Sequence, residues 1–145
     1  MTRKPALVVD DNPANRDFLE RLMMSAGFDV LGASTGKEAL THAESQPELL
    51  LALIDMELPD MNGIQLTAAL RARYPDAYIV VATMHDEYSI IESVMQKGAN
   101  VFLVKPHGFM ELYRRLTSND FKTLCEQGAV VIDQYGVRLF DAATR

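Results

Sequence analysis

The sequence has a single cysteine, no tryptophan and no apolar run that approaches the roughly 18 residues of a membrane span. Because one cysteine, Cys125, cannot form an intramolecular disulfide, a reducing compartment is expected. Cys125 follows Leu124 in an apolar setting, so we expect its side chain to be a small hydrophobe of the core. The N-terminus has too short an apolar stretch to be a signal peptide. These features predict a cytoplasmic protein without a membrane segment.

Positive charge is also scarce. The 145 residues include 14 Lys and Arg against 20 Asp and Glu, which gives a formal net charge of −6. This balance excludes the basic surface with which a protein binds nucleic acid directly. With 48% apolar residues, the chain has the composition and length of one ordinary globular domain.

The chain does contain a regular alternation of short apolar runs and helical patterns. The run from Leu49 to Ile54 is unbroken and ends at Asp55, which is typical of a strand buried on both faces of a parallel sheet. Each strand is followed by a helical pattern, and the first of these helices opens at Asn12-Pro13. The alternation predicts an α/β fold, a doubly wound five-stranded parallel sheet with helices on both faces. The other predicted strands are residues 6–9, 28–33, 78–82 and 101–104.

The pattern changes after Leu116, so we divide the chain into residues 1–117 and a C-terminal extension of residues 118–145. Ser118 or Asn119 could cap a short helix in this extension. Residues 129–133 and 137–141 then resemble a β-hairpin with a glycine in its turn. Such a hairpin is marginal alone and must pack on something. It could mediate dimerisation, cover an output surface or begin a further domain.

Polar side chains of particular types follow four of the five predicted strands. Because the carboxyl ends of parallel strands meet at one edge of the sheet, these side chains should converge. Three carboxylates at one place repel one another unless a cation lies between them. An ammonium group and a hydroxyl complete the set. The residues are Asp10, Asp11, Asp55, Thr83 and Lys105.

This combination fits a phosphoryl group carried on a carboxylate. Carboxylate and carbonyl oxygens are the ligands that Mg²⁺, or Mn²⁺ in its place, prefers. We assign Asp55 as the nucleophile and phosphoacceptor, and Asp10 and Asp11 as metal ligands together with Asp55 itself. The backbone carbonyl of Glu57 could supply a further ligand. Lys105 would pair with the phosphoryl group, and Thr83 would donate a hydrogen bond to it.

Four motifs in the right order resemble the receiver domain of two-component response regulators, and the resemblance covers about residues 5–117. The motifs are VVDDNPANR (8–16), LIDMELPDMNG (53–63), VVATM (80–84) and GANVFLVKP (98–106). The resemblance implies the strand order 2-1-3-4-5. It also implies phosphorylation of Asp55 by a histidine kinase or phosphotransfer protein, and a protein-interaction surface that responds to it.

The resemblance assigns roles to several further residues. Thr83 would move toward the phosphoryl group while Phe102, on the fifth strand, turns inward. The bond between Lys105 and Pro106 would be cis. Met84 stands where the family has a small residue, so its thioether could shield the phosphoryl group. Glu57 and His85 occupy positions that tune attack by water, in a direction that we do not predict.

Two other functions remain open. A receiver-like interaction module that is never phosphorylated is one, although the intact set of site residues argues against it. A phosphatase with an aspartate nucleophile is the other, but Asp10-Asp11-Asn12 lacks a second aspartate two residues after the first. The output partner could be a downstream protein, a missing effector domain or a second copy in a homodimer.

Overall fold

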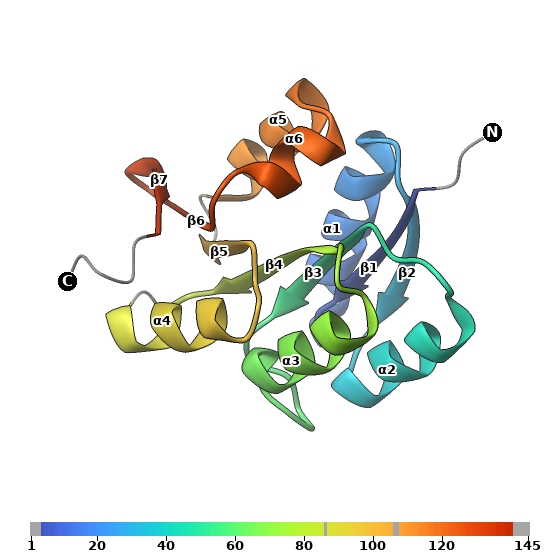
Figure 1. The fold of residues 1–145 in the computed structure, drawn as a ribbon. Coiled ribbons are helices and arrows are strands. Elements are labelled where there is room, and N and C mark those ends of the chain that lie inside the picture. Colours follow the sequence, from blue (N-terminus) through green and yellow to red (C-terminus); the bar gives the residue numbers. More distant parts are fainter. Residues whose placement is uncertain (1–3, 86, 106–107, 141–145) are drawn as a thin grey trace.

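A computed structural model describes residues 4–85, 87–105 and 108–140, and it has one seven-stranded sheet between two layers of helices (Figure 1). The elements in chain order are β1 (Pro5–Val9), α1 (Pro13–Ser25), β2 (Asp29–Ala33), α2 (Gly36–Ser45), β3 (Leu51–Asp55), α3 (Gly63–Arg73), β4 (Tyr78–Thr83), α4 (Tyr88–Gln96), β5 (Val101–Val104), α5 (Gly108–Ser118), α6 (Phe121–Glu126), β6 (Val130–Asp133) and β7 (Gly136–Leu139).

The strand order is β2-β1-β3-β4-β5-β6-β7. Strands β1 to β6 are parallel to one another, and β7 pairs antiparallel with β6. The predicted order of the first five strands is therefore confirmed. The predicted hairpin is present as well, and it continues the main sheet beyond β5 instead of standing apart from it.

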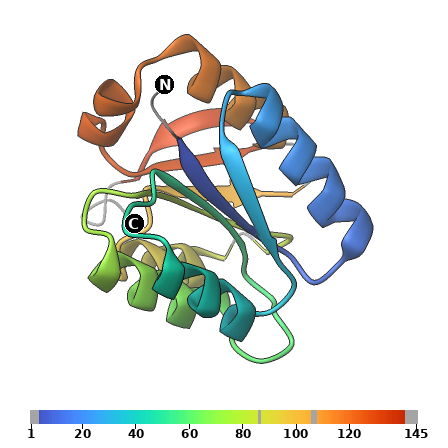
Figure 2. The same cartoon turned by 90° about the vertical axis from the view of Figure 1, so that its right-hand side faces the viewer.

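The core lies on both faces of the sheet because strands β1, β3, β4 and β5 are apolar and buried throughout most of their length. Helices α2, α3 and α4 cover one face, and α1, α5 and α6 cover the other (Figures 1 and 2). Alternate residues of β3 belong to the two clusters: Ala52 and Ile54 face α2 and α3, whereas Leu51 and Leu53 face the layer with α1.

One of the two predicted helix caps is confirmed. Asn12 caps α1 by accepting a hydrogen bond from the Asn15 amide, as the Asn-Pro pair predicted. Helix α6 is an exception, because Asp120, and not Ser118 or Asn119, accepts from the amide of Thr123 at 2.8 Å.

Two further predictions need correction. Cys125 is exposed, because the six-residue helix α6 turns Leu124, rather than the thiol, toward the core. The hairpin strands are also displaced: β6 begins one residue later than predicted, at Val130, and β7 begins one residue earlier, at Gly136 with φ of +115°, and ends at Leu139. Asp141, at the end of the second predicted strand, and Pro106, with its predicted cis bond, lie outside the described residues.

Hydrogen bonds close the end of the sheet where β4 and β5 begin. The guanidinium of Arg71, at the end of α3, donates to the carbonyls of Gly98, Tyr74 and Pro75 and to Oδ1 of Asn100. The same Asn100 oxygen accepts from the amide of Ile79 at the start of β4. These bonds join the ends of α3 and α4 to the sheet. Among the described residues, no helix is long and apolar enough to cross a membrane.

Candidate functional site

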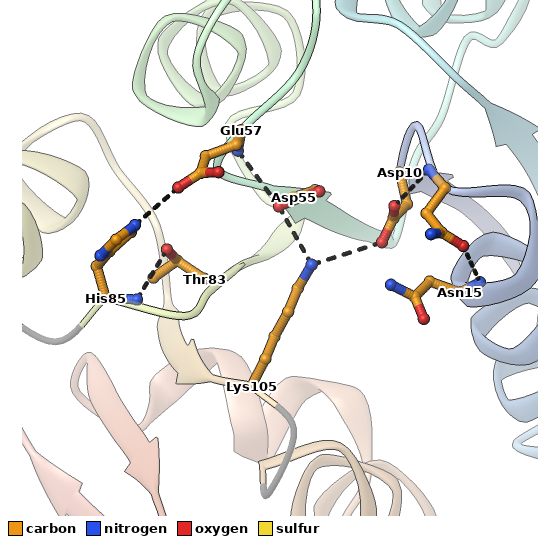
Figure 3. A network of polar contacts seen from close by, with 8 residues as sticks. Asp10, Asn15, Asp55, Glu57, Thr83, His85 and Lys105 are labelled. Atoms are coloured by element: carbon orange, nitrogen blue, oxygen red, sulfur yellow. Dashed lines mark hydrogen bonds and ion pairs between the residues drawn. The ribbon is translucent and has the colours of Figure 1, made fainter.

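Four of the five predicted polar residues, Asp10, Asp55, Thr83 and Lys105, meet at the carboxyl ends of the parallel strands (Figure 3). Asp55 is the last residue of β3 and pairs in register with Ala82 of β4, so that Thr83, the last residue of β4, lies next to it. Asp10 follows β1 and Lys105 follows β5. The strands place all four side chains on one edge although they are far apart in the sequence.

Lys105 is the central cation of the site. Its ammonium lies 3.2 Å from Oδ1 of Asp55 and 3.6 Å from Oδ2 of Asp10. The side chain of Asp10 is only 2% exposed and that of Asp55 only 11%, so these charges interact in a medium of lower dielectric than water. One ammonium group therefore faces two largely buried carboxylates, which leaves the site with an excess of negative charge.

Asp10 has one oxygen that is satisfied and one that is not. Its Oδ1 accepts from the amide of Asn12 at 2.9 Å, and its backbone carbonyl accepts from the guanidinium of Arg16 at 2.9 Å. Its Oδ2 is buried without a hydrogen bond. A buried carboxylate oxygen in this condition is costly unless a cation binds it.

The three aspartates together fit a divalent cation. Oxygens of Asp10, Asp11 and Asp55 lie within 4.8 Å of one another, and Asp11 is exposed, which leaves a path from solvent. Carboxylates with water are the donor set of Mg²⁺ and Mn²⁺. The buried unsatisfied oxygen of Asp10 and the excess of negative charge both favour such an ion at this place.

Burial also changes the acidity of Asp55. It raises the pKa of the Asp55 carboxyl, and the nearby Asp10 carboxylate raises it further. The ammonium of Lys105 and the amide of Glu57, which donates to Oδ1 at 3.2 Å, oppose this rise. The net direction is upward, so the unliganded site disfavours the ionised form of Asp55.

Two loops are joined across the mouth of the site. Nε2 of His85 lies 2.9 Å from Oε1 of Glu57, and the amide of His85 donates to Oγ1 of Thr83 at 3.2 Å (Figure 3). Met84 is 66% exposed. Sequence reasoning placed these residues near the site but missed the pair of Glu57 and His85. Their equal offset of two residues from the ends of neighbouring strands is the signal that could have predicted it.

A second missed contact holds the loop that follows Asp55. The carboxylate of Asp60 accepts from the amides of Gly36 and Lys37, each at 2.9 Å, and so binds the N-terminus of α2. Asn62 and Gln65 form a capping box at the start of α3. The C-terminal half of the loop that carries Glu57 is thereby fixed to α2 and α3.

The site opens to solvent as a hollow of about 320 Å³. Its lining combines the acidic, cationic and hydroxyl groups with the loop after β3, and consists of Asp11, Asp55, Glu57, Leu58, Pro59, Thr83, Met84 and Lys105. Phe102 is not part of this hollow. It is fully buried in the core on the α4 side of the sheet.

Comparisons with known proteins point to one family. The family described as response regulator receiver domain matches residues 6–117. A probable C4-dicarboxylate response regulator of Halalkalibacterium halodurans is 31% identical over 126 residues, which cover 81% of this chain and 53% of that protein. The chain spans about half the length, or less, of the curated relatives that it matches first.

Solved structures have the same fold. A CheY-like receiver domain protein from Methanospirillum hungatei has a TM-score of 0.77 at 25% identity, over 88% of this chain and 100% of that one. A response regulator from Burkholderia pseudomallei has a TM-score of 0.71 at 28% identity, over 85% of this chain and 72% of that one. The latter structure is described with a phosphorylated aspartic acid, a calcium ion and citrate.

Proposed function

Because the chain belongs to the response regulator receiver domain family, whose members act in two-component signalling, we propose that Asp55 is its phosphoacceptor. The observation that carries this proposal is the position of the Lys105 ammonium, 3.2 Å from Asp55 and 3.6 Å from Asp10 at the carboxyl edge of the sheet. The phosphorylated aspartic acid of the Burkholderia regulator supports it.

The donor would be a phosphohistidine of a histidine kinase or phosphotransfer protein. A carboxylate oxygen of Asp55 attacks phosphorus, an O–P bond forms, and the N–P bond breaks with its electron pair left on the histidine nitrogen. The ammonium of Lys105 stabilises the negative charge on the phosphoryl oxygens, and the hydroxyl of Thr83 donates a hydrogen bond to one of them. The chain thus acts as a switch that accepts a phosphoryl group, and not as an enzyme on a separate substrate.

The acidic residues supply the metal site of this proposal. Asp10, Asp11 and Asp55, with the backbone carbonyl of Glu57, would hold Mg²⁺, and Mn²⁺ also suits these oxygens. When bound, the ion neutralises charge on the carboxylates and on the phosphoryl oxygens. Asp10 contributes the oxygen that is otherwise buried without a hydrogen bond.

Residues at the mouth of the hollow would set the lifetime of the phosphoryl group. The joined side chains of Glu57 and His85 and the exposed thioether of Met84 lie beside the path that water takes to Asp55. Phe102 is buried against the neighbouring strands. Its side chain would change orientation when Thr83 moves, and this would alter the surface near α4.

The test is phosphoryl uptake from acetyl phosphate with Mg²⁺, measured by intact-protein mass spectrometry. We expect one phosphoryl group on the wild-type protein and none on Asp55→Asn. Asp60→Asn is the matched control, since Asp60 lies on the same loop but its carboxylate binds the N-terminus of α2. Uptake by Asp55→Asn, or its absence from the wild type, would contradict the assignment. Turnover of a phosphomonoester would instead favour a phosphatase.

A further inference from the structure

The hairpin of residues 130–140 covers the edge of the sheet that β5 would otherwise leave open. Strand β6 pairs parallel with β5, with Phe102 opposite Val131 and Leu103 opposite Ile132. Phe102 and Val131 are 0% and 2% exposed and belong to the same apolar cluster as the inner face of α4. The hairpin is therefore an integral part of the α4–β5 surface (Figure 1).

The hairpin also contacts helix α4 through an aromatic pair. Phe140, which follows β7, stacks on Tyr88, with ring centroids 6.1 Å apart and an interplanar angle of 29°. The amide of Phe140 donates to the carbonyl of Ala129 at 2.7 Å, which fixes the backbone beneath the ring. Phe140 packs against the cluster that contains Phe102, whereas its neighbour Leu139 is 70% exposed. The side chain of Phe140, at the end of the hairpin, thus contacts the first residue of α4.

Tyr88 is a short distance along the chain from the phosphorylation site. It is the first residue of α4, and it follows Thr83 by five positions. The amide of His85 donates to the Thr83 hydroxyl oxygen at 3.2 Å, so His85, three positions before Tyr88, is tied to the side chain of Thr83. The N-cap residue Glu87 makes no side-chain capping bond.

We infer that the hairpin of residues 130–140 is an intramolecular partner of the α4–β5 surface, and that phosphorylation of Asp55 loosens its contact with Tyr88. This inference rests on the proposed function. In the present arrangement the Thr83 hydroxyl oxygen accepts from the His85 amide. A Thr83 side chain that moves toward a phosphoryl oxygen draws His85 with it, and so draws the N-terminal end of α4 away from Phe140. Linkage makes the effect reciprocal: loss of the aromatic contact must favour the phosphorylated arrangement by the same factor.

The first measurement is amide hydrogen exchange on the full wild-type chain, with and without Mg²⁺ and beryllofluoride as the phosphoryl mimic. Binding of the mimic is followed separately by ¹⁹F NMR. We expect amides of residues 130–140 to exchange at least about fivefold faster when the mimic is bound, while those in β1 and β3 do not. Unchanged exchange in the hairpin of a protein that binds the mimic would overturn the inference and leave the proposed function intact.

The second measurement uses two neighbouring variants. Phe140→Ala should bind beryllofluoride at least about fivefold more tightly than the wild type, and Leu139→Ala, on the same hairpin, less than about twofold. Equal affinity of Phe140→Ala and the wild type would overturn the coupling. If Phe140→Ala does not fold, the exchange experiment on the wild type decides alone. Absence of any binding of the mimic would overturn both the inference and the proposed function.

Discussion

At the carboxyl ends of the strands, one Lys105 ammonium faces two carboxylates, and one buried oxygen of Asp10 has no hydrogen bond. At the amino ends, the guanidinium of Arg71 donates to three carbonyls and to Asn100, whose side-chain oxygen also accepts from β4. The comparison indicates that polar groups at the amino ends of the strands contribute more to the stability of the fold than those at the carboxyl ends. At the functional end an oxygen of Asp10 is buried without a hydrogen bond, whereas the polar groups of Arg71 and Asn100 at the opposite end have theirs.

Removal of Arg71 should have the largest effect on stability. Arg71→Met leaves the carbonyl of Gly98 and its neighbours without their donor, and we expect the free energy of unfolding to fall by about 3 kcal/mol. Urea unfolding measures this. Arg21→Met is the control, because Arg21 is exposed and pairs only with Asp17, and it should cost less than about 0.5 kcal/mol. Phosphoryl uptake per folded molecule should stay unchanged. Equal losses of unfolding free energy in Arg71→Met and Arg21→Met would show that the hydrogen bonds of Arg71 do not stabilise the amino ends of the strands more than an exposed ion pair does.

A substitution at the functional end should act in the opposite direction. In EDTA at neutral pH, Asp55→Asn removes a carboxylate that competes with Asp10 for Lys105, and we expect the free energy of unfolding to rise by about 1 kcal/mol. Asp60→Asn, the same change on the same loop, should lower it, because Asp60 accepts from two amides at the start of α2. A loss of stability in both variants would show that the charges at the site are satisfied without a metal.

The stability difference between Asp55→Asn and the wild type should depend on pH, because the pKa of Asp55 is raised in the folded protein. A carboxyl whose pKa rises on folding stabilises the folded state in its protonated form. This stabilisation is complete below the ordinary carboxyl pKa and is lost as the pH rises through the raised value. The advantage of Asp55→Asn over the wild type should therefore shrink as the pH falls from 7 toward the ordinary carboxyl range. Urea titrations in EDTA at several pH values test this, and a constant difference would contradict it.

The smallest effect on stability is expected at Met84. Met84→Ala removes a side chain that is 66% exposed, so the free energy of unfolding should change by less than about 0.5 kcal/mol. Dephosphorylation should nevertheless become faster, because the thioether lies at the mouth of the hollow above Asp55. The decay of the phosphorylated protein, followed by mass spectrometry, measures the rate. An unchanged lifetime would show that Met84 does not shield the phosphoryl group.

The positions of the main site residues could be predicted from the sequence because the carboxyl ends of parallel strands all lie at one edge of the sheet. Asp10, Asp55, Thr83 and Lys105 each end or follow an apolar run, and no further information was needed to expect them together. The contact of Glu57 with His85 required the register of β3 with β4, and its hydrogen bond required side-chain torsions that the sequence does not determine.

The C-terminal residues were harder to predict because their structure depends on distant partners. The apolar run of β6 indicates a strand, but its pairing with β5 depends on how α5 and α6 cross the sheet. The exposure of Cys125 depends on the rotation of a helix with only six residues, too short for its periodicity to decide which side chains are buried.

The arrangement around Arg71 has a mechanical consequence for α4. That helix is fixed at its C-terminal end, where Gly98 accepts two bonds from the guanidinium, while its N-terminal end is packed through Tyr88 and Phe140. A tilt of α4 about Gly98 would therefore displace its N-terminal end the most. Nine residues make a lever about 13 Å long, so a swing of about 5° carries Tyr88 by roughly 1 Å. A gap of that size already forfeits a quarter to a half of a van der Waals contact.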